Sequence, residues 1–301
     1  MLPSILSLLS LATAAIALSH TPFASRQAPN TIYPSDPVGQ TASWNLTAFA
    51  LPIKKSLAQS MANGHKLLPV RGLPAGYLKE DEHPLILYGG LQHDIRQVGV
   101  TIPNLVIQRT LLPFVDASND GSTAFTRIPT VIYISQLVPA LAGTLQQLNN
   151  MVLANFDPPD AAYKSIGGGQ MSLSVDVGVK LDGLLGLPTP DSPVVNAIFS
   201  RAGSSNRKSI HPKFFKGVLS APYEHTDIPT CTKQTFYFDE TYAHPFRVKG
   251  STVQVLFPSL PSAMTFKNVY GLSIAAQWDN PFGPGQSCAS LRSDAQAVKY
   301  E

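Results

Sequence analysis

Cysteine is scarce in this chain, and the scarcity limits the sites that it can form. The sequence has 301 residues and two cysteines, Cys231 and Cys288. Two thiols are too few for a disulfide scaffold or a structural zinc site. In an oxidising compartment they can pair with each other, and we expect that they do because no third cysteine competes. On the chain-entropy model this disulfide stabilises the fold by about 4 kcal/mol.

Charge is also low. Charged residues make up 14% of the chain and hydrophobic residues 44%. This balance excludes a disordered or coiled-coil chain, since both need many more charged residues. The net charge of +3 is too small for a dedicated nucleic-acid binder of this length.

The sequence lacks the short motifs of common catalytic and cofactor sites. It contains no G-x-S-x-G, no H-E-x-x-H, no P-loop and no G-x-G-x-x-G. The run Gly167-Gly168-Gly169 is not followed by the lysine and helix of a phosphate loop, so we interpret it as a turn. None of the seven histidines pairs with another at metal-ligand spacing. We therefore expect no cofactor and no metal site.

Residues 1–19 predict a secretory signal peptide. Leu2 to Leu18 are apolar or small and uncharged, and the run is short for the ~20 residues of a membrane span. The segment has no lysine or arginine before its apolar run, which leaves a retained anchor or a buried helix as alternatives. Since no other run of 18 apolar residues follows, we expect a secreted, extracellular protein without membrane contact after signal removal.

Residues 20–65 predict an N-terminal arm, followed by one domain over residues 66–301. Residues 20–44 are rich in proline, serine and threonine, as in flexible arms. Helical spacing over Ser43–Met61 is interrupted by Pro52. Within it, Asn45-Leu46-Thr47 is the only N-glycosylation sequon, so Asn45 is the predicted glycosylation site.

Alternation and turn residues predict a strand-rich fold. The 26 prolines and 21 glycines are dispersed, which indicates many turns. The clearest strand runs from Met171 to Leu181, where apolar and polar residues alternate. Further strands are expected at residues 85–88, 95–102, 105–114, 130–134, 234–238, 252–257 and 269–278. So many strand edges favour a closed or nearly closed antiparallel barrel.

Helical periodicity is limited to short segments. Apolar residues recur every three or four positions from Leu137 to Val152, which predicts the main amphipathic helix with Ser135 at its N-cap. A shorter helix is expected over Val194–Ser200. The predicted fold class is therefore a β-rich α+β fold.

One polar cluster stands out on a predicted strand. In His93-Asp94-Ile95-Arg96, Asp94 and Arg96 share one strand face and can present a charge pair inside a barrel. The alternative is a surface ion pair worth less than ~1 kcal/mol. Arg127 is a further charge on a strand-like segment, and arginine suits carboxylates because its fork donates two parallel hydrogen bonds. Asp94, Arg96 and Arg127 are the predicted ligand-binding residues.

Five short segments follow one another in a characteristic order over about residues 70 to 280. They are His83-Pro84-Leu85, Tyr88-Gly89-Gly90, His93-Asp94-Ile95-Arg96, Leu112-Pro113-Phe114-Val115-Asp116 and Val138-Pro139-Ala140-Leu141. Together they resemble secreted fungal members of the acetoacetate decarboxylase-like superfamily. The resemblance implies a cone-shaped, double-layered β-barrel with a few flanking helices and a cavity for a small carbonyl substrate. In the decarboxylases, a lysine in that cavity forms a Schiff base with a β-keto acid.

The lysine of that chemistry is not found at the matching positions. The family's Pro-Lys-Lys segment falls on residues 143–154, where Met151 and Val152 occupy the two lysine positions. Neither side chain can form an imine, which needs a neutral amine in an apolar pocket or beside a cation. Lys164 is the nearest downstream lysine and the weak catalytic candidate, and Lys180 is another. The alternative for both is a solvated surface lysine.

The sequence therefore supports three hypotheses. The first is a secreted acetoacetate decarboxylase-like protein that binds a small carbonyl or carboxylate compound without the Schiff-base lysine. The second is an active β-keto acid decarboxylase, a lyase, that uses another lysine such as Lys164. The third is a non-catalytic interaction protein. We expect a small-molecule ligand and no nucleic acid as partner, and the sequence leaves a homo-oligomer open.

Overall fold

The computed structural model describes residues 29–300, with gaps in the middle of the chain. The gaps are 98, 138, 140–149, 178–192, 204–208, 227, 239–244, 257, 259–261 and 282–284. The predicted signal peptide over residues 1–19, Lys180 and most of the predicted helix at Leu137–Val152 lie outside the described residues.

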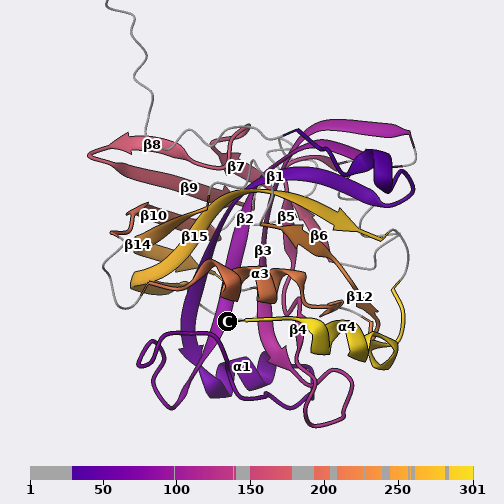
Figure 1. Ribbon diagram of the computed structural model, residues 1–301. Helices are drawn as coiled ribbons and strands as arrows, with labels where there is room; N and C mark the ends of the chain where they lie inside the picture. Colours follow the sequence, from indigo (N-terminus) through magenta and orange to yellow (C-terminus); the bar gives the residue numbers. More distant parts are fainter. Residues whose placement is uncertain are drawn as a thin grey trace, which may run out of the picture.

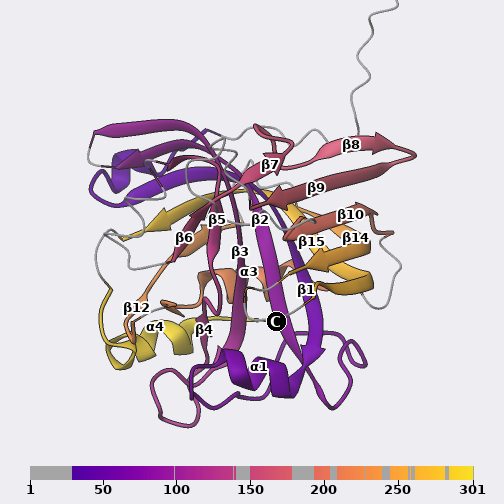
Figure 2. The same cartoon turned by 180° about the vertical axis from the view of Figure 1, so that it is seen from behind.

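Strands dominate the described residues and belong to one fifteen-stranded sheet (Figures 1 and 2). They are β1 (Gln40–Lys54), β2 (Glu82–Gln97), β3 (Val100–Val115), β4 (Phe125–Arg127), β5 (Ile132–Ile134), β6 (Met151–Leu153), β7 (Asn155–Asp157), β8 (Lys164–Gly167), β9 (Gln170–Asp176), β10 (Val195–Arg201), β11 (Tyr223–Glu224), β12 (Cys231–Thr232), β13 (Thr235–Tyr237), β14 (Phe246–Val255) and β15 (Met264–Asn280). The described helical segments are η2 (Tyr33–Ser35), α1 (Lys55–Met61), α3 (Pro212–Ser220), η3 (Cys288–Leu291) and α4 (Arg292–Ala297).

The main path of the sheet is open at both ends. Its order is β12-β11-β4-β3-β2-β1-β15-β14-β10-β9-β7, and most neighbours are antiparallel. Within the described part of the chain, the terminal strands β12 and β7 do not pair with each other. The strand-rich prediction is thus confirmed, whereas the closed barrel is not.

Strand β1 lies between β2 and β15 in the middle of the sheet. It is buried on both faces, from Thr41 to Leu51. Its first half alternates polar and apolar residues, and the polar ones, Thr41, Ser43, Asn45 and Thr47, are buried as well. The helical spacing over Ser43–Met61 was misleading, since only α1 is helical there. The arm predicted over residues 20–65 is wrong for β1 and α1, which are part of the sheet and its covering.

Strands β2 and β3 form a long hairpin that merges three predicted strands. They pair from Ile86 with Leu111 to Gln97 with Val100. Asp94 has a positive φ of 48° and lies where the pairing of β2 with β1 shifts register. The sequence pattern predicted separate strands at residues 85–88 and 95–102, whereas β2 continues past the irregularity at Asp94. The irregularity changes the direction of the side chains around Asp94.

Two elements differ from their predicted type. The helix expected over Val194–Ser200 is strand β10, in which Val195, Ala197 and Phe199 are buried and the residues between them are half-buried. This period of two is typical of a strand and not of a helix. Helix α3 was not predicted, although Pro212 begins it and the His211 side chain caps it by accepting a hydrogen bond from the N–H of Lys213.

The two faces of the central strands pack against separate hydrophobic clusters. One face, with Trp44 and Tyr88, packs against α3, which crosses it in Figure 1. The opposite face, with Phe49 and Leu87, packs against β9, β10 and β14. Neighbouring residues of one central strand therefore enter two different environments.

Candidate functional site

Two neighbouring polar residues of β3 place an amide on one face of the sheet and a guanidinium on the other. Gln108 and Arg109 follow Val106-Ile107 and precede Thr110-Leu111 in a strand that is buried throughout this stretch. The pairing of Tyr88 with Arg109 and of Gly89 with Gln108 fixes which face each side chain takes. Gln108 lies on the face of Phe49 and Leu87, and Arg109 lies on the face of Trp44 and Tyr88.

Two small pockets adjoin Gln108 on its face. One has about 210 Å³ of space, including its opening to solvent, and reaches towards Gly90, Phe156 and Ala162. The other has about 230 Å³ and reaches towards Tyr133 and Val255. Their enclosed parts each have room for about one water molecule. We call the two pockets together the Gln108 chamber.

The lining of the chamber includes Asp157 and Arg109 and also neutral polar groups that are not fully used. The Gln108 side chain is 3% exposed and the Tyr133 side chain 7%, and neither makes a hydrogen bond with another described residue. Burial raises the pKa of Tyr133 to about 12, so its hydroxyl keeps its proton. Thr110 and Thr130, which also line the chamber, are hydrogen-bonded to each other at 2.9 Å.

Gly89 makes the position of Gln108 possible. A Cβ atom on Gly89 would lie 2.5 Å from Oε1 of Gln108 and 2.3 Å from the carbonyl oxygen of Ile107. Only glycine leaves enough room for the amide to lie over the neighbouring strand. The glycine in Tyr88-Gly89-Gly90 thus has a packing role at this chamber.

On the opposite face, Arg109 is enclosed by aromatic rings. The Cζ atom of Arg109 lies 4.8 Å from the ring centroid of Tyr88 and 5.4 Å from that of Trp44. Its Nη2 donates a hydrogen bond to Oε1 of Gln234 at 3.2 Å, and the same oxygen accepts from Nε1 of Trp278 at 3.1 Å. Arg109 is 7% exposed, and no described carboxylate lies within ion-pair distance of it.

Several donors of this cluster have no acceptor. Nε of Arg109, Nε1 of Trp44 and the hydroxyl of Tyr88 are buried without a hydrogen-bond partner. Burial raises the pKa of Tyr88 to about 12, while the nearby Arg109 and Gln234 act in the opposite direction without making a hydrogen bond of normal geometry to the hydroxyl. Each unsatisfied buried group costs about 1–3 kcal/mol, more where it is charged. Each cation–π contact returns about 0.5–2 kcal/mol. We call Arg109, Trp44, Tyr88 and Gln234 the Arg109 cluster.

His225 lies within electrostatic range of this cluster. Burial lowers the pKa of His225 to about 4, and the positive charge of Arg109 lowers it further in the same direction. Its Nε2 is 2.7 Å from Oγ1 of Thr232. The imidazole is therefore neutral at pH 7, and it does not compensate or add to the charge of Arg109.

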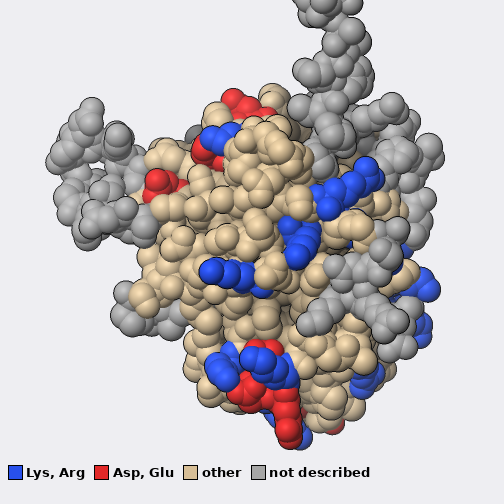
Figure 3. All heavy atoms as spheres, turned by 90° about the vertical axis from the view of Figure 1, so that its left-hand side faces the viewer, with Lys and Arg blue, Asp and Glu red and all other residues tan. Residues whose placement is uncertain are grey.

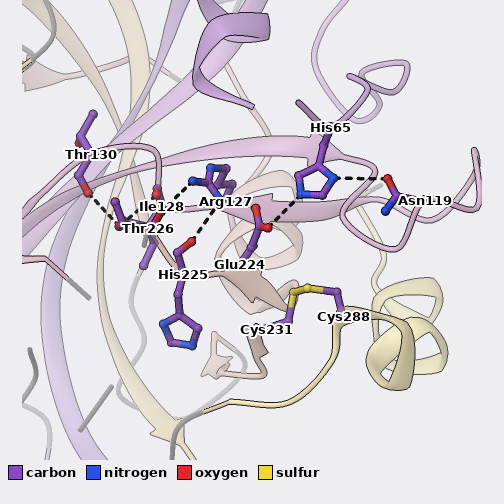
Figure 4. Close-up of polar contacts among 10 residues, drawn as sticks. All are labelled: His65, Asn119, Arg127, Ile128, Thr130, Glu224, His225, Thr226, Cys231 and Cys288. Carbon is purple, nitrogen blue, oxygen red and sulfur yellow. Dashed lines mark hydrogen bonds and ion pairs between the residues drawn. A yellow bond between two sulfur atoms is a disulfide. The ribbon is translucent and has the colours of Figure 1, made fainter. Parts of the chain in front are cut away.

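Arg127 of β4, one of the predicted ligand-binding residues, is occupied by protein groups. Its Nη1 is bound to the Glu224 carboxylate and also donates to the carbonyl of His225 at 3.1 Å, and its Nη2 donates to the carbonyl of Thr226 at 2.9 Å (Figure 4). The second oxygen of Glu224 lies 2.9 Å from Nε2 of His65. The Arg127 and Glu224 side chains are 6% and 1% exposed. These contacts give Arg127 a structural role and leave its charge compensated.

Asp94 and Arg96 form the predicted ion pair, but at the border of the sheet and not in an enclosed cavity. Nε of Arg96 donates to Oδ1 of Asp94 at 2.7 Å, with side chains 41% and 29% exposed. Asn30 binds the main-chain carbonyl of Asp94 at 3.0 Å, and Arg96 lies over the ring of Tyr33. The pair thus holds the segment before β1, which matches the surface alternative.

The lysines do not support an imine site in the described residues. Lys164, in β8, is 46% exposed and forms an ion pair with Asp157. All other described lysines are exposed or half-buried. In β6, Met151 packs against the cluster on the α3 face and Val152 against that on the other face. A buried amine that could lose its proton is therefore not found where the structure can be read.

The predicted disulfide is confirmed, and the sequon is buried. Cys231 and Cys288 are bonded, with Cα atoms 4.9 Å apart, and link β12 to η3 (Figure 4). Asn45 is 5% exposed in the middle of β1, and its Oδ1 has no hydrogen-bond partner. A glycan needs open space, so this position argues against Asn45 as a glycosylation site in the folded chain.

The described surface has no other clear site. Acidic and basic side chains gather at the end of the molecule where α1 lies (Figure 3), and include the pairs Lys54–Asp81 and Lys79–Glu82. No group of three or more His, Cys, Asp or Glu among the described residues could hold a metal ion. None of the helices in the described ranges is long and apolar enough to span a bilayer.

Sequence reasoning missed Gln108 and Arg109. The available signal was two polar residues, Gln108-Arg109, within the apolar run from Leu105 to Leu112. Such an interruption predicts buried polar groups, because a strand that is covered on both faces has no solvent for them. The aromatic partners come from β1 and β2, and only the strand register brings them together.

Comparisons with known proteins give structural likenesses only. No protein-family model matches the chain, and no curated protein matches it. Among solved structures, an acetoacetate decarboxylase from Legionella pneumophila is similar, with 11% identity and a TM-score of 0.49 over 83% of this chain and 88% of that one. An acetoacetate decarboxylase-like enzyme from Sphingomonas wittichii has 8% identity and a TM-score of 0.43, over 83% and 92%. The enduracididine biosynthesis enzyme MppR has 13% identity and a TM-score of 0.45, over 83% and 89%. These low values assign neither a family nor an activity to this chain, and the secreted fungal origin remains a prediction.

Proposed function

We propose that this chain is an exported protein that binds a small carbonyl-containing compound in the Gln108 chamber without forming an imine. The observation that carries the proposal is a pair of buried residues in the lining of the chamber, Gln108 and Tyr133, whose amide and hydroxyl make no hydrogen bond with another described residue. Small-molecule sites typically combine an apolar wall with a few such groups.

The chemistry of the lining suits a carbonyl oxygen. The Gln108 amide and the Tyr133 hydroxyl can both donate to a neutral acceptor, and the Gln108 oxygen can accept from a hydroxyl or an amide. Leu87, Val195 and Val255 supply apolar contact for a short carbon chain. The enclosed space is small, so the ligand has only a few heavy atoms or displaces side chains on entry.

Schiff-base decarboxylation through Lys164 is disfavoured by geometry. The Lys164 amine is half-exposed and paired with Asp157, so it does not lie in the enclosed apolar space that an imine-forming lysine needs. A non-catalytic interaction protein is the second candidate. The observation in its favour is the small size of the two pockets, since each encloses room for about one water molecule whereas ligand pockets begin at ~300 Å³.

The test is a thermal-shift panel of small ketones, aldehydes, esters and keto acids, followed by variants. A true ligand at 100 times its dissociation constant stabilises the wild type by ~2.7 kcal/mol. Gln108→Leu and Tyr133→Phe should each abolish or weaken that shift. Gln254→Leu is the control, since Gln254 lies between Val253 and Val255 on β14 and faces away from the core.

Borohydride treatment with the bound carbonyl compound tests the second half of the proposal. No mass adduct on a lysine should form. An adduct, or a ligand shift that Gln108→Leu leaves unchanged, contradicts the proposed site. A panel in which no compound shifts the melting temperature favours the interaction protein.

A further inference from the structure

The Arg109 cluster has an excess of donors and of positive charge. Arg109, Trp44 and Tyr88 come from β3, β1 and β2, which are neighbours in the sheet, and their side chains share the α3 face. Each of the three carries a buried polar atom that lacks a hydrogen-bond partner. The one acceptor that the described cluster supplies, Oε1 of Gln234, is already shared between Arg109 and Trp278.

The described surroundings do not supply a negative charge. Among the described residues, no Asp or Glu forms an ion pair with Arg109, and the titratable groups on which its charge acts include the neutral His225 and Tyr88. Arginine is almost never buried unless a counter-charge or acceptor accompanies it. The stacked rings attract the cation, but they leave the N–H groups at its edge without acceptors.

We propose that the Arg109 cluster binds a small planar oxyanion, such as a carboxylate, whose oxygens accept hydrogen bonds from Arg109, Trp44 and Tyr88. The guanidinium edge matches a planar anion because its N–H groups lie in one plane and point in fixed directions. The Arg109 and Gln108 side chains take opposite faces of β3, although Arg109 also contributes to the lining of one pocket of the Gln108 chamber. The proposed carboxylate site uses Trp44 and Tyr88, which do not line that chamber.

A purely structural role for Arg109 is the competing explanation. Arg201 shows what such a role is like, since its Cζ lies 5.1 Å from the ring of Phe246 at an exposed position. At that position water satisfies the guanidinium, so the cation–π contact needs no further partner. At Arg109 the same contact is buried, and the remaining donors have no water-exposed side to turn to.

Tryptophan fluorescence provides a direct readout. The chain has two tryptophans, and both belong to this region, Trp44 against Arg109 and Trp278 against Gln234. Sodium formate and sodium acetate are titrated into the purified protein at constant ionic strength, which sodium fluoride maintains. We expect a saturable change in emission and a matching rise in melting temperature for the two carboxylates, and none when sodium chloride replaces them.

Variants then locate the binding. Arg109→Met keeps the apolar stem and removes the charge, so it should abolish the saturable change. Tyr88→Phe removes only the hydroxyl and should weaken affinity by about tenfold to a hundredfold, as the loss of one hydrogen bond to a charged group does. Arg201→Met, the matched arginine on an exposed ring, and Gln108→Leu, on the other face, should both bind as the wild type does.

The proposal fails if the carboxylates give only a linear, unsaturable change, if chloride gives the same saturable change, or if Arg109→Met binds as tightly as the wild type. Should Arg109→Met not fold, Tyr88→Phe and Trp44→Phe decide the matter, since each keeps an aromatic ring in place. Unchanged affinity in both of these variants would overturn the site. A loss of carbonyl binding in Gln108→Leu with intact carboxylate binding separates this result from the proposed function.

Discussion

Two buried arginines of this protein sit in opposite electrostatic environments. Arg127 is bound to the Glu224 carboxylate and two main-chain carbonyls, and Glu224 in turn contacts His65 (Figure 4). Arg109 has two aromatic faces and one amide oxygen, and no carboxylate among its described neighbours. The two residues are equally hidden from solvent, so burial alone does not distinguish a structural arginine from a candidate binding residue.

The difference teaches where to look for a ligand. A buried charge that is paired with a carboxylate is already compensated, and removing its partner is costly. Arg127 and Arg109 each keep a buried Nε without a hydrogen-bond partner, so the missing carboxylate among the described neighbours is what distinguishes Arg109. The sequence pattern included Arg127 among the predicted ligand-binding residues, with Asp94 and Arg96, and overlooked Arg109.

The largest effect is expected at the paired arginine. Glu224→Gln leaves the Arg127 charge buried without a counter-charge, so the free energy of unfolding should fall by about 3–5 kcal/mol. Urea unfolding measures it, with Asp294→Asn as control, because Asp294 pairs with Lys233 at the surface and should cost less than about 1 kcal/mol. The double variant Arg127→Met/Glu224→Leu should recover most of the loss. Equal costs for Glu224→Gln and Asp294→Asn would remove the contrast between the two arginines.

The next effect concerns the amide that the Arg109 cluster uses as its acceptor. Gln234 accepts from Arg109 and Trp278 and donates to the carbonyl of Leu219 at 2.7 Å. Gln234→Leu leaves all three groups unpaired, and we expect a loss of about 3 kcal/mol in urea unfolding. A formate-saturated sample should recover part of it. If Gln234→Leu costs nothing, the hydrogen bonds of the cluster do not contribute to stability.

A pH effect of intermediate size is expected from His225. The pKa of His225 in the folded chain is about 4, below the ordinary histidine value of 6.5, so the unfolded chain binds more protons and stability falls as pH decreases. This contribution is complete above pH 6.5 and declines by about 2 kcal/mol when pH is lowered from 8 to 5. Melting temperatures of the wild type and His225→Gln measure it, and the variant should show a flatter profile. Arg109→Met should also flatten the profile partly, because it removes the positive charge that lowers the pKa of His225 in addition to burial. Parallel profiles for Arg109→Met and the wild type would contradict an interaction between Arg109 and His225.

The smallest effect is expected at Arg109 itself. Without an anion, Arg109→Met removes an uncompensated charge and keeps the stem, so stability should change by less than about 1 kcal/mol or rise slightly. The same comparison in saturating formate should favour the wild type. A loss as large as that of Glu224→Gln in both conditions would show that Arg109, like Arg127, is a structural residue.

The sequence predicted the elements whose two faces differ. The alternation from Met171 onwards predicted β9. The sequence analysis failed at β1, where both faces are buried and polar Thr41, Ser43, Asn45 and Thr47 gave no contrast between a wet and a dry face. It also failed at β10, because seven residues are too short a window to separate a period of two from a helical turn.

The candidate sites were less predictable than the fold. The Asp94–Arg96 pair follows from their spacing along one strand, and the ion pair is present. Their position at the border of the sheet depends on the irregularity at Asp94 and on Asn30 from an earlier segment. The Arg109 cluster depends on the register of three strands, and spacing along one strand carries no information about it.

Because Gln108 and Arg109 lie on opposite faces, the pairing register of β3 with its neighbouring strands cannot change by one residue. A shift by a single residue would exchange the two side chains, placing a guanidinium on the face of the Gln108 chamber and an amide between the indole and phenol rings. Gly89 would then oppose the wrong neighbour as well. Insertions and deletions in the hairpin should therefore be confined to its tip around Gly99, while the stem keeps a constant length in any functional variant.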